Sequence, residues 1–383
     1  MRLLHTSDWH LGRTLHGEPL LDYQRAFVQW LVATAVDRGV DAVLVAGDVY
    51  DRAVPTTDAV AVLDEALVGL HRARVPVLLT SGNHDSAIRL GFGSELHRAA
   101  GVHVRTRVAE LDEPVLVHDA AGPVALYGLP YLLPDAVMAE LGTERSHAAV
   151  LHAAVARIRA DAARRGVDRT VVVAHAFVTG GAACESERDI RVGGIGDAPL
   201  SVFDGVSYAA LGHLHGAQRL GAHVAYSGSP LAFSFSERHQ VKSVSVVELD
   251  GAGHVDIELV DTPHARPLQQ VHGKLDDLLE RAGGDLRGLA DAWVKVILTD
   301  ANRVPAAMDR LRQVWPHTLV LEYQPEGGLV DAATDLARVT GATDPIEICA
   351  AFVEWVDSTR PDATQRDALH AVLEAVRAEE LSA

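Results

Sequence analysis

The chain has 383 residues, more than one ordinary domain contains, so we expect two or three domains. Hydrophobic residues make up 48% of the chain and charged residues 22%, a balance that supports sizeable cores and argues against a disordered chain. The formal net charge of −18 argues against a protein that grips phosphate backbones through a basic surface of its own. An anionic substrate would therefore need bound cations, a local basic patch or a partner.

Cysteine use and hydropathy predict a cytoplasmic protein. The two cysteines, Cys184 and Cys349, lie far apart and form no metal-binding spacing, which fits a reducing compartment. The apolar run at the N-terminus is too short for a signal peptide. Since the sequence has no apolar run long enough to cross a bilayer, we expect no association with membranes.

The first hundred residues alternate between apolar runs and amphipathic segments. The apolar runs predict buried strands, because a strand covered on both faces is hydrophobic almost throughout. The amphipathic segments carry apolar residues at helical spacing, as Phe27, Leu31 and Ala35 do. The predicted order is a strand at 2–6, a helix at 23–38, a strand at 41–46, a helix at 57–73 and a strand at 75–79. This alternation is typical of a layered α/β fold.

Polar side chains follow these three strands at the point where each strand ends. Asp8 and His10 follow the first strand, Asp48 follows the second, and Asn83 follows the third. Asp8 and His10 are two residues apart, so in an extended backbone they would point to the same side. The three strand ends therefore offer carboxylate, imidazole and amide groups in a regular pattern.

The same pattern returns later in the chain. His175 follows a predicted strand at 170–174, and His213 and His215 follow another at 208–211. Functional groups in layered α/β folds collect at the carboxyl ends of strands. We therefore expect all seven side chains to lie close together.

Two further parts follow the domain predicted for residues 1–262. Residues 263–340 predict a small βαβαβ domain, whose sequence shows no set of ligand-type side chains. Residues 341–383 predict a tail of two amphipathic helices, the first beginning at Asp344 with Glu347 at the capping-box position. These helices could pack on their own domain or dock on a partner protein, and the sequence leaves both open.

The seven side chains offer oxygen and nitrogen donors alone, which excludes a structural tetrathiolate zinc site. Seven donors are too many for one small cation, but they suit two cations that share a bridging carboxylate. Asp48 is the expected bridge, because its strand lies between the other contributors. Such a pair of cations clamps the attacking and leaving oxygens of a phosphoryl displacement. A site rich in imidazole favours manganese, iron or zinc over magnesium.

Five motifs occur in a fixed order along the chain, and they resemble the motifs of the calcineurin-like metallophosphoesterases. They are Ser7-Asp8-Trp9-His10-Leu11-Gly12, Gly47-Asp48-Val49-Tyr50-Asp51, Gly82-Asn83-His84-Asp85, Ala174-His175 and Gly212-His213-Leu214-His215. Within this superfamily the chain is most similar to the SbcD family, the nuclease subunits of SbcCD complexes. The opening residues 5–10, the turn at 227–230, the small following domain and the terminal helices favour that family.

The resemblance implies a four-layer αββα sandwich with a small α/β capping domain and C-terminal helices. It implies a first metal held by Asp8, His10, Asp48 and His215, and a second held by Asp48, Asn83, His175 and His213. His84 would act on the leaving oxygen of the scissile phosphate without ligating a metal, and Asp85 would orient His84. One departure is Asp51, where relatives in other kingdoms carry a histidine, so the resemblance supports no second catalytic histidine there.

The resemblance also implies a function, a manganese-dependent DNA nuclease. It would be an exonuclease on double-stranded DNA and an endonuclease on single-stranded or hairpin DNA, serving DNA repair, recombination and replication at the nucleoid. A homodimer, joined through the helices at 57–73 and 86–100, would work with an SbcC-type ATPase bound by the C-terminal helices. Two alternatives stay open. One is a small-molecule phosphodiesterase or phosphatase of the same superfamily, against which the extra domains argue. The other is a non-catalytic scaffold, which would have lost ligands that this chain keeps.

Overall fold

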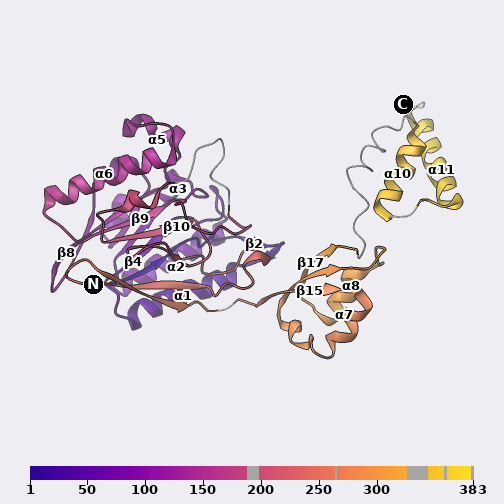
Figure 1. Ribbon diagram of the computed structural model, residues 1–383, viewed down its shortest axis with the longest axis horizontal. Coiled ribbons are helices and arrows are strands. Elements are labelled where there is room, and N and C mark those ends of the chain that lie inside the picture. The colour runs from indigo at the N-terminus through magenta and orange to yellow at the C-terminus, as the bar shows by residue number, and fades with distance from the viewer. Residues whose placement is uncertain (188–197, 264, 326–343, 358–359, 381–383) are drawn as a thin grey trace. The chain divides into compact units, whose positions relative to one another are not determined.

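The computed structural model describes residues 1–187, 198–263, 265–325, 344–357 and 360–380, with residues 355–357 and 374–380 described by their backbone alone. The chain divides into two compact units, Met1–Ala265 and Arg266–Ala383 (Figure 1). The predicted three-part division at 262 and 340 stays a prediction, because its second boundary and the tail residues 341–343 and 381–383 lie outside the described residues.

One six-stranded sheet of the first unit carries the three strands that precede the first polar motifs. Its order is β14-β13-β1-β4-β5-β6, formed by β1 (Arg2–Thr6), β4 (Ala42–Ala46), β5 (Val77–Thr80), β6 (Val102–Arg105), β13 (Ser243–Leu249) and β14 (Val255–Asp261). The strands β1, β4, β5 and β6 are parallel, with Leu4 opposite Val43 and Val43 opposite Val77. The carboxyl ends of β1, β4 and β5 therefore meet at one edge of the sheet, with β4 in the middle.

A second six-stranded sheet carries the two strands that precede the later histidines. Its order is β11-β12-β10-β9-β8-β7, formed by β7 (Val115–Asp119), β8 (Gly122–Leu129), β9 (Thr170–His175), β10 (Tyr208–Gly212), β11 (Gln218–Arg219) and β12 (Val224–Tyr226). The strands β8, β9, β10 and β12 are parallel, and Gly212 pairs with His175. The ends of β9 and β10 therefore lie side by side.

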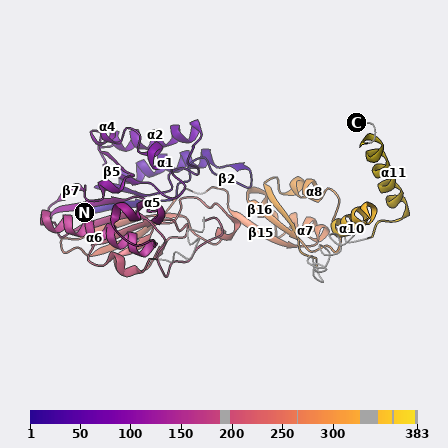
Figure 2. The same ribbon diagram turned by 90° about the horizontal axis from the view of Figure 1, so that it is seen from above.

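The two sheets pack face to face, and helices cover their outer faces (Figure 2). The helices are α1 (Leu21–Asp37) and α2 (Thr57–Arg72) on the first sheet, and α5 (Pro134–Leu141) and α6 (His147–Arg165) on the second. In β4, Val43 and Val45 face the helices, while Ala42, Leu44 and Ala46 face the other sheet. Because both faces are covered, this strand is apolar throughout, and the predicted four-layer αββα sandwich is confirmed.

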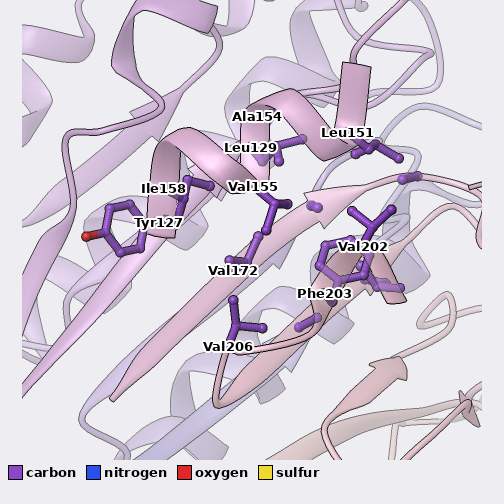
Figure 3. Close-up of a cluster of buried hydrophobic side chains, with 14 of the residues drawn as sticks. Tyr127, Leu129, Leu151, Ala154, Val155, Ile158, Val172, Val202, Phe203 and Val206 are labelled. Atoms are coloured by element: carbon purple, nitrogen blue, oxygen red, sulfur yellow. The ribbon is translucent and has the colours of Figure 1, made fainter. Parts of the chain in front are cut away.

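The core under the second sheet illustrates the packing of its covering helix (Figure 3). Leu151, Val155 and Ile158 recur at helical spacing in α6 and pack in one cluster with Val172 of β9 and with Phe203. Phe203 comes from the short 3₁₀ helix η2 (Leu200–Phe203). All five side chains are almost fully buried, and each such burial stabilises the fold by about 1.5–3 kcal/mol.

Smaller elements of the first unit lie in the loops around these layers. They are β2 (Thr14–Leu15), β3 (Glu18–Pro19), α3 (Ala87–Leu90), α4 (Ser94–Arg98) and the 3₁₀ helices η1 (Val108–Glu110) and η3 (Phe235–Glu237). The side chain of Ser86 accepts a hydrogen bond from the backbone N–H of Arg89 and so caps α3 directly after the motif at 82–85.

The second unit begins with the predicted βαβαβ arrangement. It consists of β15 (Leu268–Gly273), α7 (Leu275–Ala282), the 3₁₀ helix η4 (Arg287–Asp291), β16 (Trp293–Leu298), α8 (Ala307–Val314) and β17 (Thr318–Tyr323), with its three strands parallel in the order β15-β16-β17. Two helices follow, α10 (Pro345–Asp357) and α11 (Ala363–Glu380), which pack against each other. The carboxylate of Asp344 accepts a hydrogen bond from the N–H of Ile346 at 3.0 Å, as the predicted cap requires. Within the described residues, no helix combines the length and the apolar character needed to cross a membrane.

Candidate metal centre

The loops after β1 and β4 run alongside each other and bring the first ligand candidates together. The N–H of Asp8 donates to the carbonyl of Gly47 at 3.0 Å, and the N–H of His10 donates to the carbonyl of Asp48 at 3.0 Å. These hydrogen bonds continue the pairing of two parallel strands beyond their ends. Asp8, His10 and Asp48 therefore reach the same region from adjacent loops.

The backbone at these positions differs from the extended form that the sequence analysis assumed. Asp8 has φ 53°, His10 has φ 43°, Asp48 has φ 48° and His213 has φ 111°. Positive φ is uncommon for residues other than glycine and costs of the order of 1–3 kcal/mol at each position. The two side chains at positions 8 and 10 thus converge through left-handed backbone and not through the alternation of a strand.

Two glycines allow the loops to approach one another. A Cβ on Gly82 would lie 2.1 Å from the Asp48 Oδ1 atom, and a Cβ on Gly212 would lie 1.9 Å from the carbonyl oxygen of Ala46. Gly82 is not among the positive-φ glycines of the described chain, so its backbone conformation does not itself require glycine. Space for Asp48 is what requires glycine there. The N–H of His84 then donates to Asp48 Oδ1 at 2.8 Å and holds the carboxylate.

One cluster of donor atoms joins Asp8, His10, Asp48 and His215. The Nε2 atoms of His10 and His215 lie 3.2 Å apart, and His10 Nε2 lies 3.6 Å from Asp48 Oδ2. Donor atoms of Asp8, His10 and His215 all lie within 4.8 Å of one another. The structure thus brings together the four residues expected at the first metal position.

A second cluster joins Asp48, Asn83, His175 and His213. His175 Nε2 lies 2.8 Å from Asn83 Oδ1 and 3.5 Å from Asp48 Oδ2, while His213 Nδ1 lies 3.3 Å from Asn83 Oδ1. These are the four residues expected at the second metal position. The Oδ2 atom of Asp48 is close to a histidine of each cluster, as a bridging ligand would be.

The protonation states that burial favours fit a pair of cations. Burial lowers the pKa of His10 and His175 well below the usual range and that of His215 to about 4, so these rings are neutral and can ligate a metal. Burial also raises the pKa of Asp8 to about 8 and that of Asp48 well above its usual range. Bound dications would supply the positive charge that keeps both carboxylates ionised.

The contact between His175 and Asn83 also fits a bound cation. His175 Nδ1 donates to the carbonyl of Ala46 at 2.9 Å, so its Nε2 carries a lone pair that faces the Asn83 oxygen. Two electron-pair donors at hydrogen-bond distance repel each other unless a cation lies beside both. The residues present therefore fit two metal ions, which would supply Lewis-acid chemistry at a phosphate.

His84 lies at the rim of the first cluster, with its Nε2 atom 4.0 Å from Asp48 Oδ2. Its Nδ1 atom lies 2.8 Å from the carbonyl oxygen of Asp51 and donates to it. This bond turns Nε2 toward the metal centre. The structure thus gives Asp51 a role through its backbone, which the sequence analysis did not foresee.

Asp85 has contacts that differ from the expected ones. The sequence analysis expected its carboxylate to orient His84, but that carboxylate accepts backbone hydrogen bonds from Val49 at 3.1 Å, Tyr50 at 2.9 Å and Gly82 at 2.9 Å. Asp85 therefore ties the loop after β5 to the loop after β4. The His84 Nδ1 atom donates instead to the backbone carbonyl of Asp51.

Sequence reasoning missed the side chains behind His215. Ser186 Oγ lies 2.7 Å from His215 Nδ1 and also contacts the buried carboxylate of Glu237, which pairs with Lys242. No motif spacing joins positions 186, 237 and 242. The one signal was the turn at 227–230, whose Ser229 hydroxyl lies 3.1 Å from Lys242 Nζ.

Comparisons with known proteins agree with this geometry. Residues 1–217 match the family model for the calcineurin-like phosphoesterases. Residues 264–354 match the SbcD C-terminal model, described as the Type 5 capsule protein repressor C-terminal domain. The second match begins at the boundary between the two compact units.

Solved structures similar to the chain are distant. TT1561 of Thermus thermophilus is 17% identical, with 67% of this chain and 98% of that chain covered and a TM-score of 0.38. The calcineurin-like phosphoesterase YfkN from Bacillus subtilis is 12% identical, with coverages of 83% and 97% and a TM-score of 0.36. At identities this low, the two family models are the informative comparisons.

The first family model spans more than half of the chain, and its range contains all seven donor residues. The His and Asp clusters are compatible with a dinuclear metal site. The protein is accordingly a metal-dependent phosphodiesterase, and the chain belongs to the calcineurin-like phosphoesterase family, as a nuclease of the SbcD type.

Proposed function

We propose that the protein is a two-metal DNA nuclease that acts with an SbcC-type ATPase in DNA end processing, repair and recombination. The observation that carries the proposal is the shared position of Asp48, between two donor clusters, in a chain whose second unit matches the SbcD C-terminal model. The proposed substrates are double-stranded DNA ends for exonuclease cleavage and single-stranded or hairpin DNA for endonuclease cleavage.

The proposed metals are two manganese ions. Imidazole and carboxylate donors in this ratio suit manganese better than magnesium, which prefers oxygen ligands. When bound, such ions stabilise the charge of the phosphate and lower the pKa of a bound water toward 7. The first would be held by Asp8, His10, Asp48 and His215, and the second by Asp48, Asn83, His175 and His213.

The proposed proton donor is His84. The Asp51 carbonyl fixes its Nδ1–H, and Nε2 then faces the metal centre, 4.0 Å from Asp48 Oδ2. A protonated Nε2 there can donate to the leaving oxygen of a scissile phosphate or stabilise its developing charge. Asp85 acts indirectly, by fixing the two loops that place Asp48 and His84 next to each other.

The proposed assembly is a homodimer bound to the ATPase. Ile88, Phe92 and Leu96 are 88%, 82% and 80% exposed and follow one another at intervals of four residues around α3 and α4. A run of large exposed apolar side chains supports an interface there with a second copy of the chain. The α10–α11 pair is the proposed docking site for the ATPase, supported by the exposed Phe352.

The test compares DNA with a small substrate. Purified protein with manganese is incubated with linear duplex DNA, with a DNA hairpin and with bis(p-nitrophenyl) phosphate, alone and with the ATPase subunit. We expect cleavage of DNA at a kcat/KM well above that of the small ester. If the small ester is turned over while DNA stays intact under every condition, the protein is a small-molecule phosphodiesterase instead.

A further inference from the structure

A chain of side chains leads from the metal-ligand candidate His215 into the protein interior. His215 Nδ1 lies 2.7 Å from Ser186 Oγ, and the same hydroxyl contacts Glu237 Oε1. The other oxygen of Glu237 accepts a hydrogen bond from Lys242 Nζ. Glu237 and Lys242 are buried, and neither is part of the family motifs.

The chemistry of these groups fixes the direction of the hydrogen bonds. Glu237 pairs with the ammonium of Lys242 and is ionised, so its carboxylate can only accept. The Ser186 hydroxyl has a single proton and must donate it to Glu237. The hydroxyl oxygen then accepts from His215, whose proton has to be on Nδ1. Nε2 then carries the lone pair of the ring, and it lies 3.2 Å from His10 Nε2.

Lys242 and the loop at 186–187 also hold the backbone around His215. Lys242 Nζ donates to the carbonyl of His215 at 2.9 Å. A carboxylate oxygen of Glu187 accepts from the N–H of His215, and Arg13 Nη2 donates to the carbonyl of Ser186 at 2.8 Å. The side chain of Ser186 thus contacts the ring of His215, and the side chain of Glu187 contacts its backbone.

We propose that Ser186, Glu237 and Lys242 are positioning residues that lock His215 in the Nδ1–H form and so set the affinity of the first metal position. The inference rests on the proposed two-metal function. Residues that orient a histidine ligand typically change metal affinity by about 10–100-fold. At the second metal position, His175 is oriented differently, by the backbone of β4.

Metal binding provides the first measurement. Manganese is titrated into the metal-free full-length protein and its Ser186→Ala variant, followed by calorimetry and by the electron paramagnetic resonance of free manganese. We expect one of the two sites of Ser186→Ala to bind about 10–100-fold more weakly, with the other unchanged. Ser186→Thr, which keeps a hydroxyl, should restore tight binding, and Ser201→Ala, an exposed serine of the same unit, should match the wild type.

The tautomer provides a second measurement that needs no metal. Ring ¹⁵N shifts of metal-free protein, with His215 assigned from the spectrum of His215→Gln, should report Nδ1–H for the wild type. Glu237→Gln offers an amide that can donate to Ser186, so we expect a mixed tautomer at His215 in that variant. A His215 already mixed in the wild type, or equal manganese affinities in wild type and Ser186→Ala, would overturn the inference. If the wild type bound no manganese, the proposed two-metal function would be wrong. The tautomer of His215 would still show whether Ser186 and Glu237 orient its ring.

Discussion

His175 and His215 occupy corresponding places in the two donor clusters, yet they are held in different ways. His175 Nδ1 donates to the carbonyl of Ala46, a backbone atom of β4. His215 Nδ1 is held by the Ser186 hydroxyl and, behind it, by Glu237. A backbone acceptor comes with the fold and no substitution removes it, whereas a side-chain relay can be altered one residue at a time. Side-chain substitutions can therefore alter how the histidine is held at the first metal position, but not at His175 in the second.

The difference is also visible in the electrostatics of the two rings. Burial lowers the pKa of both histidines, and the neighbouring His213 lowers that of His175 further. At His215 the nearby carboxylate of Glu237 opposes the effect of burial, and the pKa falls to about 4. We expect the carboxylate behind Ser186 to make His215 a stronger electron donor than a ring held by a neutral carbonyl.

Replacing Asp48 should impair both metal positions alike. Its Oδ2 atom lies 3.6 Å from His10 Nε2 in the first cluster and 3.5 Å from His175 Nε2 in the second. We expect Asp48→Asn to lose both cations and to cleave DNA more than about 10⁴-fold more slowly, since the charge stabilisation from both metals is lost. Metal content by mass spectrometry and cleavage rates measure this. Asp37→Asn, at an exposed carboxylate of α1, is the control, and a variant at Asp48 that retained one tight cation would show that Asp48 is no bridge.

Replacing His84 should leave metal binding at both positions intact and strongly slow DNA cleavage. Its imidazole contacts the Asp51 carbonyl and faces the clusters from outside, so we expect His84→Gln to bind two manganese ions and to lose about 10³-fold in DNA cleavage rate. Single-turnover cleavage at saturating manganese measures the rate. His152→Gln, at an exposed histidine of α6, should be indistinguishable from wild type. Near-full cleavage by His84→Gln would remove it from the mechanism.

Removing the metals should loosen the sandwich, because each cluster takes donors from both sheets. A cation present at 100 times its Kd stabilises the folded state by about 2.7 kcal/mol, which corresponds to a Tm shift of roughly 5 °C or more in a domain of this size. Differential scanning calorimetry with manganese and after chelation measures the shift. Ser186→Ala should show a smaller shift than wild type. Equal Tm values for wild type with and without manganese would mean that the clusters do not bind it.

Removing the C-terminal helices should have the smallest effect on metal binding by the two donor clusters. Removing residues 344–383 deletes α10 and α11, and none of the seven donor residues lies in that range. We expect unchanged manganese binding and loss of association with the ATPase subunit, measured by co-purification from co-expressing cells. A truncated chain that still co-purifies would place the docking site elsewhere.

Much of the fold and of the donor set could be predicted from the sequence. Strands such as β4 are apolar throughout because both faces are covered, and polar residues directly after strands must lie at one edge of a parallel sheet. The orientation of the rings could not be predicted in this way. The Asp51 carbonyl and the Ala46 carbonyl act through backbone atoms, which any residue carries. Ser186 and Glu237 meet only because two distant loops fold over His215.

The contact between Gly212 and Ala46 has a consequence for the site as a whole. Since a Cβ on Gly212 would lie 1.9 Å from the Ala46 oxygen, the two sheets touch there backbone against backbone. The same oxygen accepts the hydrogen bond from His175. Main-chain atoms therefore fix the distance between the two sheets at this edge, independently of the side chains that line the site. Side chains around this edge can be exchanged, but the spacing between the loops that carry the two donor clusters comes with the fold.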